Sequence, residues 1–191
     1  MKVVIGTKDQ YYIQTNNAQV ELMRDYFQKK RYIACGPTSF VAGLDISGYD
    51  MKVFTPGVQP EDAIIMLLHN PNHLGMWRAI RDLDYDKYPP NEVPQLYPGV
   101  GRILYKKEVC KFSWGINLDI IKREIDDGLP VMVGGKFSFG GHYVLIVGYD
   151  GDRVIYNDPY PLGYADGKGY NLELSPDDFE RMISKYKITF I

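Results

Sequence analysis

The chain has 191 residues, of which 45% are hydrophobic and 14% aromatic, and its 22 basic and 24 acidic side chains give a net charge of −2. This length fits one compact domain, and the aromatic content excludes a disordered chain. The near balance of charge provides no basic field that would attract nucleic acid or an anionic membrane surface. We therefore expect a folded globular protein that does not bind nucleic acid.

No segment has the pattern of an export signal or of a membrane span. The beginning of the chain has too few consecutive apolar residues for a signal peptide. The longest apolar runs, residues 63–68 and 143–147, fall far short of the ~18 residues that suggest a transmembrane helix. We expect no membrane-spanning segment.

The first part of the chain predicts helices. Asn17 is a plausible cap for a short helix that continues through Phe27, with apolar residues at rough helical spacing. A mostly apolar run after Cys35, with Pro37 in the first turn, predicts a buried helix that opens at Cys35. Acidic residues in front of the apolar run 63–68 predict another helix, which should lie mostly in the core.

Residues 84–101 have a different composition, because they hold four prolines and three tyrosines. Proline removes the hydrogen-bond donors that helices and strands need, while tyrosine still anchors a chain to its surroundings. We predict an ordered but irregular surface segment that could border a substrate groove. It belongs to an irregular insertion around residues 70–105 within a single domain that spans residues 1–191.

The second part of the chain predicts one helix followed by strands. The helix is expected between its Asn117 cap and Gly128. Residues Asp150-Gly151-Asp152 have the composition of a hairpin turn, and Ser175 is a plausible cap of a last helix. Strands are predicted at residues 129–133, 142–149, 153–156 and 188–191. Helices first and antiparallel strands later are an α+β layout.

The chain has two cysteines, Cys35 and Cys110, which excludes a disulfide framework or a four-cysteine zinc site and leaves a single bridge between them open. A catalytic cysteine must be a thiolate near neutral pH, whereas a free thiol has a pKa of about 8.5. The predicted helix that opens at Cys35 meets part of this need, because a helix N-terminus favours an anion. The alternative is that Cys35 is a small apolar residue of the core.

His142 and Asp158 are the candidate partners of this thiol. His142 begins a predicted strand after two glycines, which leaves the access that a general base needs. A hairpin centred on Asp150 would make His142 and Asp158 neighbours, because they lie at equal distances from it along the chain. A thiol, a histidine and a carboxylate that orients the histidine are the parts of covalent acyl transfer.

Three motifs, in this order, resemble those of papain-fold cysteine peptidases of family thirty-nine, the bacteriocin-processing peptidase group. They are Ala34-Cys35-Gly36-Pro37-Thr38-Ser39, Gly141-His142-Tyr143-Val144 and Asn157-Asp158-Pro159. The resemblance covers roughly residues 10–160 and is closer to the stand-alone members of bacteria and their phages. It implies a papain-like fold in which N-terminal helices pack on an antiparallel sheet, and a cytoplasmic or phage-associated protein. It also implies that Cys35 is the nucleophile, His142 the base and Asp158 the residue that orients the base.

The resemblance further implies a glutamine before the cysteine, whose side-chain amide stabilises the oxyanion of the tetrahedral intermediate. Two glutamines compete for this role. Gln14 follows two tyrosines in an aromatic-x-Gln stretch but lies 21 residues before Cys35, whereas Gln28 lies seven residues before it, nearer the usual gap. We favour Gln14 because of the residues that flank it.

The function implied by the resemblance is that of a cysteine peptidase or amidase that cuts a peptide or peptidoglycan amide bond through an acyl-enzyme. Two alternatives stay open. The same three residues could transfer the acyl group to an amine or a thiol, or the chain could be a papain-fold binding module without catalysis.

We expect no metal or cofactor. Pro71 separates His69 from His73 and breaks the helix that would put both on one face. The alternating acidic residues of segment 82–86 lack the glycine and the final glutamate of a calcium loop.

Overall fold

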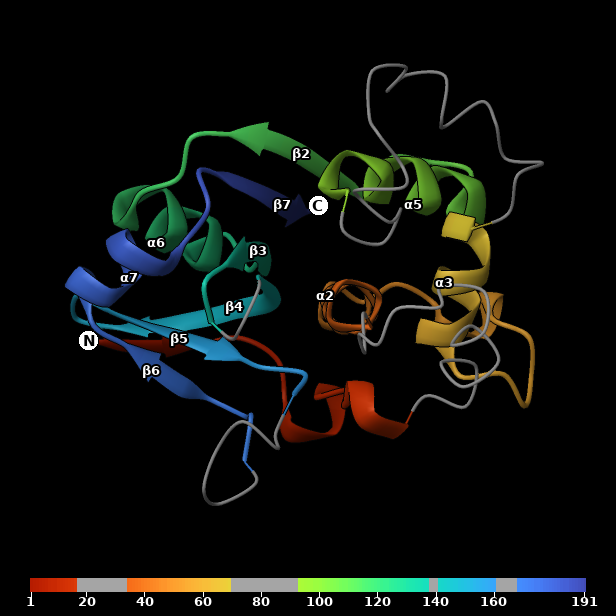
Figure 1. The fold of residues 1–191 in the computed structure, drawn as a ribbon, viewed down its shortest axis with the longest axis horizontal. Coiled ribbons are helices and arrows are strands. Elements are labelled where there is room, and N and C mark those ends of the chain that lie inside the picture. Colours follow the sequence, from red (N-terminus) through yellow and green to blue (C-terminus); the bar gives the residue numbers. More distant parts are fainter. Residues whose placement is uncertain (17–33, 70–92, 138–140, 161–167) are drawn as a thin grey trace.

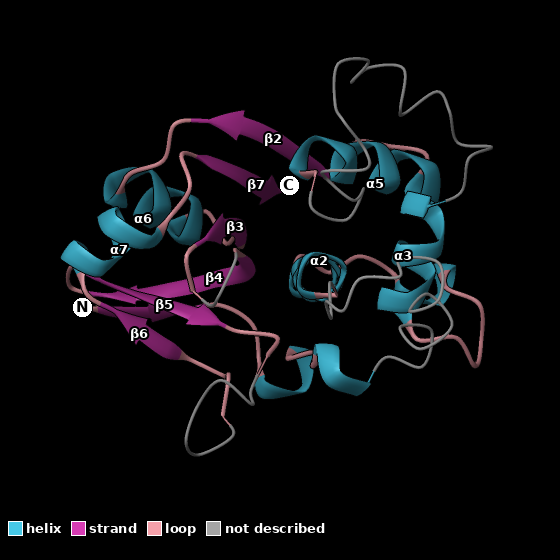
Figure 2. Cartoon of the chain, viewed as in Figure 1, coloured by secondary structure: helices cyan, strands magenta, loops and turns pink. Residues whose placement is uncertain are grey.

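A computed structural model describes residues 1–16, 34–69, 93–137, 141–160 and 168–191 of the chain. One side of the described molecule is an antiparallel sheet, and the other side is formed by helices α2 (Cys35–Ile46), α3 (Pro60–His69) and α5 (Tyr97–Tyr105) (Figures 1 and 2). The predicted α+β layout is confirmed. The predicted helix between Asn17 and Phe27 lies outside the described residues.

The sheet has seven strands. Six of them lie in the order β2 (Cys110–Trp114), β7 (Tyr186–Phe190), β3 (Val131–Gly135), β4 (His142–Asp150), β5 (Arg153–Asn157) and β6 (Leu172–Leu174). The seventh, β1 (Lys2–Val4), pairs with the last residues of β4, beyond the part that pairs with β3. Strand β4 is central, and all of its residues but the last are buried. This explains its unbroken apolar run, since both of its faces are covered.

The hairpin between β4 and β5 differs in detail from the prediction. Asp150 pairs with Arg153, so the turn is centred between Gly151 and Asp152 and not on Asp150. A register shift between Ile146 and Gly148 then moves the ladder by one residue. Asp158, just after β5, is therefore not directly opposite His142 in the ladder, and the two residues meet through their side chains.

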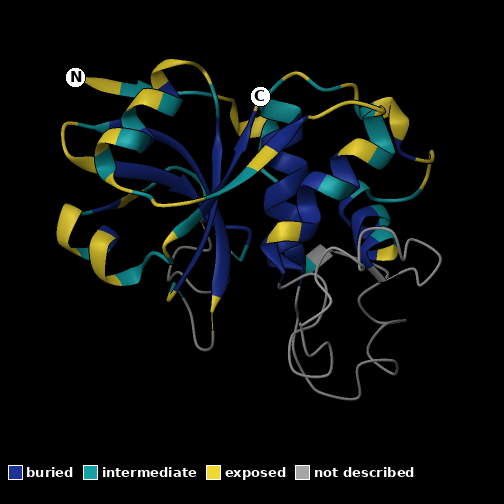
Figure 3. Cartoon of the chain, turned by 90° about the horizontal axis from the view of Figure 1, so that it is seen from above, coloured by how far each residue is buried: buried dark blue, intermediate teal, exposed yellow. Residues whose placement is uncertain are grey.

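Two hydrophobic clusters lie on the two faces of the sheet, because neighbouring residues of a strand point to opposite sides. Met132 and Tyr143 belong to the cluster that includes α2, α3 and α5. Val133 and Val144 belong to the other cluster, with α6 (Leu118–Asp126) and α7 (Pro176–Met182). Figure 3 shows the buried residues concentrated in the strands and in the helices packed against them.

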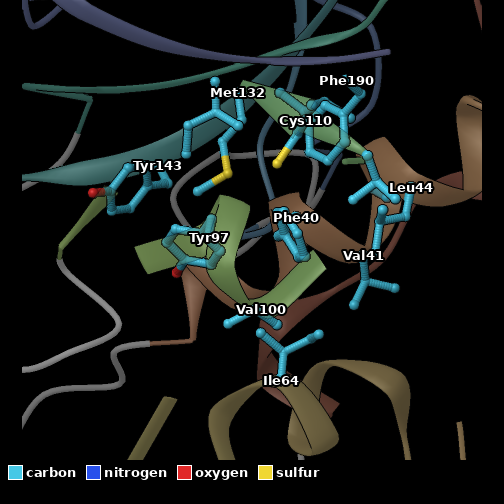
Figure 4. Packing of buried hydrophobic residues seen from close by; sticks show 14 of the residues in the cluster. Phe40, Val41, Leu44, Ile64, Tyr97, Val100, Cys110, Met132, Tyr143 and Phe190 are labelled. Atoms are coloured by element: carbon cyan, nitrogen blue, oxygen red, sulfur yellow. The ribbon is translucent and has the colours of Figure 1, made fainter. Parts of the chain in front are cut away.

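Helix α2 is buried over its first ten residues, from Cys35 to Leu44. It carries no charged residue over this length, so it can lie in the core without an unpaired charge. Phe40 packs between Tyr97 of α5 and Phe190 of β7, with ring centroids 5.0 and 5.4 Å away (Figure 4). Gly43 allows this approach, because a Cβ atom there would lie 2.2 Å from the Phe190 ring.

The prediction of an irregular surface segment is wrong for residues 94–101. Pro94–Leu96 form a 3-10 turn that leads into α5, and Pro98 stands at the start of that helix, where its missing N–H costs no hydrogen bond. Tyr97 is fully buried and packs in the core instead of anchoring a surface loop. Val93, just before the turn, is also buried. The other residues of the segment, 84–92, lie outside the described residues, and the extent of the predicted insertion stays a prediction.

The helices expected from capping residues are confirmed at two further places. The side chain of Asn117 accepts a hydrogen bond from the N–H of Ile120 at the start of α6, and the Ser175 side chain accepts one from Asp178 at the start of α7. Strands β1 and β6 were not predicted because each has three residues, and β2, which has five, was also missed. Among the described helices, none combines the length and the apolar composition that a bilayer crossing requires.

Candidate active site

Cys35 is the first residue of α2, at the helix end where the backbone N–H groups have no partner within the helix. It is 7% exposed and belongs to the cluster between α2 and the sheet. Both cysteines are free thiols, so the bridge that the sequence left open is not formed. Cys110 is fully buried, and burial raises the pKa of its thiol to about 12. Cys35 therefore keeps a small exposed fraction, whereas Cys110 has none.

His142 is the first residue of β4 and is also 7% exposed. Its Nε2 lies 2.6 Å from Oδ1 of Asp158. Because Asp158 occupies Nε2, the other ring nitrogen, Nδ1, is available for a second partner. Burial by itself lowers the pKa of His142, but hydrogen bonds with Asp158 and Cys35, and the charges of both residues, raise this pKa to about 10.

Asp158 is held in place from several directions. The same Oδ1 that contacts His142 accepts a hydrogen bond from the backbone N–H of Tyr160, 2.8 Å away. This bond spans Pro159 and forms a turn closed by the Asp158 side chain. The N–H of Asp158 donates to the carbonyl of Gly169 at 2.7 Å. Asp158 is 3% exposed. The His142 ring and the Tyr160 N–H both contact its Oδ1 and so fix the orientation of the carboxylate.

Gln14 lies beside this segment. It begins a 3-10 turn, Gln14–Asn16, and its backbone N–H donates to the carbonyl of Pro159 at 2.9 Å. The residue is 3% exposed, and its Oε1 accepts no hydrogen bond within the described parts of the chain. A buried amide with an unpaired oxygen is costly in a fold. Gln28, the competing candidate, lies outside the described residues.

The structure places His142 in interaction with both Asp158 and Cys35, and it places Gln14 next to the loop that follows Asp158. Sequence reasoning missed the role of two other residues here. Tyr11 donates a hydrogen bond to the carbonyl of Asp158, and Tyr160 supplies its N–H to the carboxylate. The only available signal for Tyr11 was its place in the aromatic stretch before Gln14.

A thiol beside a protonated imidazole can lose its proton well below its ordinary pKa, because the imidazolium stabilises the thiolate. The pair is then a nucleophile and a proton donor in contact, which is the requirement for opening an amide bond. Within the described residues, no three His, Cys, Asp or Glu side chains converge as metal ligands.

The family model described as the Peptidase_C39 like family matches residues 10–182. This chain belongs to the Peptidase_C39 like family. Membership supports a cysteine peptidase function in general terms, and it agrees with the resemblance drawn from the three motifs. No curated protein sequence matches this C39-like chain.

A solved structure shares the fold of this C39-like chain. A crystal structure described as that of a C39-like peptidase from Bacillus anthracis has a TM-score of 0.54 and 14% sequence identity, with 100% of this chain and 98% of that chain covered. A double glycine motif protease from an AMS/PCAT transporter, in complex with its leader peptide, has a TM-score of 0.49 and 11% identity, with 85% and 89% covered. The predicted papain-like fold, with helices packed on an antiparallel sheet, is confirmed by the first of these.

Proposed function

We propose that this chain is a cysteine peptidase or amidase that hydrolyses an amide bond of a peptide or of peptidoglycan. Cys35 is the nucleophile, His142 is the acid and base, and Asp158 orients the imidazole. The observation that carries the proposal is the His142 ring, which interacts with the Asp158 carboxylate and with the Cys35 thiol at once. The family to which the chain belongs supports the same class of activity.

The proposed reaction has two halves. Sγ of Cys35 attacks the carbonyl carbon, the C–N bond breaks, and the His142 imidazolium gives its proton to the leaving amine. Water then attacks the thioester while the neutral imidazole takes a proton from it, and the thiolate leaves as the carboxylic acid is released. The oxyanion of each intermediate would accept hydrogen bonds from the Gln14 side-chain amide and the Cys35 backbone N–H.

The first experiment measures the rate of Cys35 alkylation by iodoacetamide as a function of pH, with the site of labelling read by mass spectrometry. Cys110 is the internal reference, because it is buried and its pKa is raised. We expect Cys35 to react with a midpoint well below pH 8, and we expect this reactivity to be lost in His142→Ala. An ordinary thiol profile that the substitution leaves unchanged would contradict the proposal and favour a binding module.

A second experiment separates hydrolysis from acyl transfer and identifies the substrate class. Purified peptidoglycan and a peptide library are incubated with the wild type and with Cys35→Ser, with and without an added amine. Hydrolysis predicts new carboxyl ends with the wild type alone. Products that carry the amine would indicate acyl transfer, and full biological activity of Cys35→Ser would indicate that the thiol has no catalytic role.

A further inference from the structure

The phenol of Tyr11 lies against the main chain of the residue that orients His142. Its hydroxyl donates a hydrogen bond to the carbonyl oxygen of Asp158 at 2.7 Å. The backbone of Gly169 also hydrogen-bonds to the phenol. Burial and the nearby Asp158 charge raise the pKa of Tyr11 to about 12, so the hydroxyl keeps its proton and remains a donor near neutral pH.

Gly169 shows how closely these groups are packed. Its carbonyl accepts a hydrogen bond from the N–H of Asp158 at 2.7 Å. A Cβ atom at this position would lie 2.1 Å from the Asp158 carbonyl oxygen and 2.2 Å from the Tyr11 hydroxyl. Both main-chain polar groups of Asp158 are thus engaged, the N–H by Gly169 and the carbonyl by Tyr11.

The position of the Asp158 main chain decides where its carboxylate lies, because an aspartate side chain has only two rotatable bonds. The contact between Asp158 Oδ1 and Nε2 of His142 is 2.6 Å, so a small displacement of the backbone would lengthen it. Charge-assisted hydrogen bonds of this kind are strong and depend on geometry. A group that fixes the Asp158 carbonyl therefore acts on the protonation of His142.

We propose that Tyr11 is a positioning residue that holds Asp158 in the orientation at which it stabilises the His142 imidazolium. The inference rests on the proposed function, because it assigns Tyr11 a role in the same site. Tyr11 also precedes Gln14, whose N–H donates to the carbonyl of Pro159 at 2.9 Å. Residues 11–14 are thus hydrogen-bonded to two consecutive carbonyl groups, those of Asp158 and Pro159.

Tyr12 provides a matched control. It is the next residue along the chain, it is also partly buried, and its hydroxyl also donates to one acceptor, Oδ2 of Asp45 at 3.1 Å. Asp45 lies near the end of α2, whereas Cys35 begins that helix. Tyr12→Phe therefore removes the same chemical group from the same segment without removing a contact to Asp158.

The test measures the pH dependence of Cys35 alkylation by iodoacetamide in the wild type, Tyr11→Phe and Tyr12→Phe. A weaker contact between Asp158 and His142 stabilises the imidazolium less, so the thiolate forms at higher pH. We expect the midpoint for Tyr11→Phe to rise by about 1 pH unit, the effect of a partly weakened charge-assisted hydrogen bond, and that for Tyr12→Phe to equal the wild type. An unchanged midpoint for Tyr11→Phe, or an equal rise for both variants, would overturn the inference.

Gly169→Ala is the second variant, which keeps the inference testable if Tyr11→Phe folds poorly. The added methyl group would push Tyr11 and Asp158 apart while leaving both side chains intact, so the same upward shift is expected. If Gly169→Ala folds and its Cys35 alkylation has the wild-type pH midpoint, this result would count against a positioning role for Tyr11. If the wild type already shows an ordinary thiol profile, the proposed function fails and the inference fails with it. If the wild type has an activated thiol and the variants have the same midpoint as the wild type, the inference alone fails.

Discussion

The backbone N–H of Gln14 donates a hydrogen bond to the carbonyl of Pro159, 2.9 Å away. This bond joins the N-terminal segment to the loop that carries Asp158. Two candidate residues far apart in the sequence, Gln14 and Asp158, therefore lie on segments that are hydrogen-bonded to each other. Since Gln14 is buried and its Oε1 is unpaired within the described residues, its side chain contributes little to the fold through that atom. A residue kept buried at such a cost is a reasonable candidate for a role in the reaction.

Gln14→Ala should separate oxyanion stabilisation from thiol activation. We expect kcat for amide hydrolysis to fall by about 100- to 1,000-fold, the usual effect of removing one oxyanion donor. Alkylation of Cys35 by iodoacetamide should keep the wild-type rate and pH midpoint, because that reaction develops no oxyanion. The exposed Gln95→Ala is the control and should change neither rate. A parallel loss of alkylation and hydrolysis in Gln14→Ala would refute the assigned role.

Asp158→Asn and Asp158→Ala should differ in stability as well as in activity. Both lose the charge that holds the His142 imidazolium, so hydrolysis should slow by about 100-fold or more in each. Asparagine can still accept the hydrogen bond from the Tyr160 N–H, whereas alanine leaves that half-buried donor unpaired. We expect Asp158→Ala to be less stable than Asp158→Asn by about 1–3 kcal/mol, measured by urea unfolding. Equal stability of the two variants would argue against the turn closed by this carboxylate.

The raised pKa of His142 predicts a pH-dependent contribution to stability. Its pKa is about 10 in the folded wild type and near the ordinary value of about 6.5 in the unfolded chain. The folded state therefore binds the proton more tightly, and this stabilisation is fully present below about pH 6.5 and is lost as the pH rises through the folded-state pKa.

The measurement uses the Cys35→Ser background, because Cys35 itself contributes to the raised pKa of His142. In that background Asp158 still raises the pKa of His142. We compare the free energy of unfolding of Cys35→Ser with that of Cys35→Ser/His142→Gln between pH 5.5 and pH 10. The stability advantage of the variant with histidine should shrink as the pH rises, and an advantage that is constant or grows over this range would contradict the predicted sign.

Gly43→Ala should destabilise the packing of α2 on the sheet. A Cβ atom at this helix position would lie 2.2 Å from the Phe190 ring, so the ring or the helix must move. We expect a loss of about 1–3 kcal/mol in the free energy of unfolding, the usual cost of overpacking a core. In a Phe190→Leu background the same substitution should cost less, because the ring that it meets is gone. Equal costs in both backgrounds would show that the contact is relieved elsewhere.

Several elements could be predicted from local signals alone. The helix that begins at Cys35 follows from an uncharged apolar run with proline in its first turn, and α6 and α7 follow from their Asn117 and Ser175 caps. Strand β4 follows from its apolar run. Residues 94–101 could not be predicted in this way, because their prolines are compatible with a loop or with a helix start, and only burial of Tyr97 in the core selects the helix.

The residues of the candidate site were recognisable in the sequence because each carries a chemical group that acyl transfer needs, and Cys35, His142 and Asp158 lie at the start of a predicted helix or beside one end of a predicted strand. Their mutual geometry was not. The contact between His142 and Asp158 depends on a register shift inside β4, which no local pattern encodes. The hydrogen bond from Tyr11 to Asp158 joins two residues that lie 147 positions apart in the sequence. The local sequence thus determined which side chains are present and which elements carry them. The distances between these side chains depended on strand pairing and packing between distant parts of the chain.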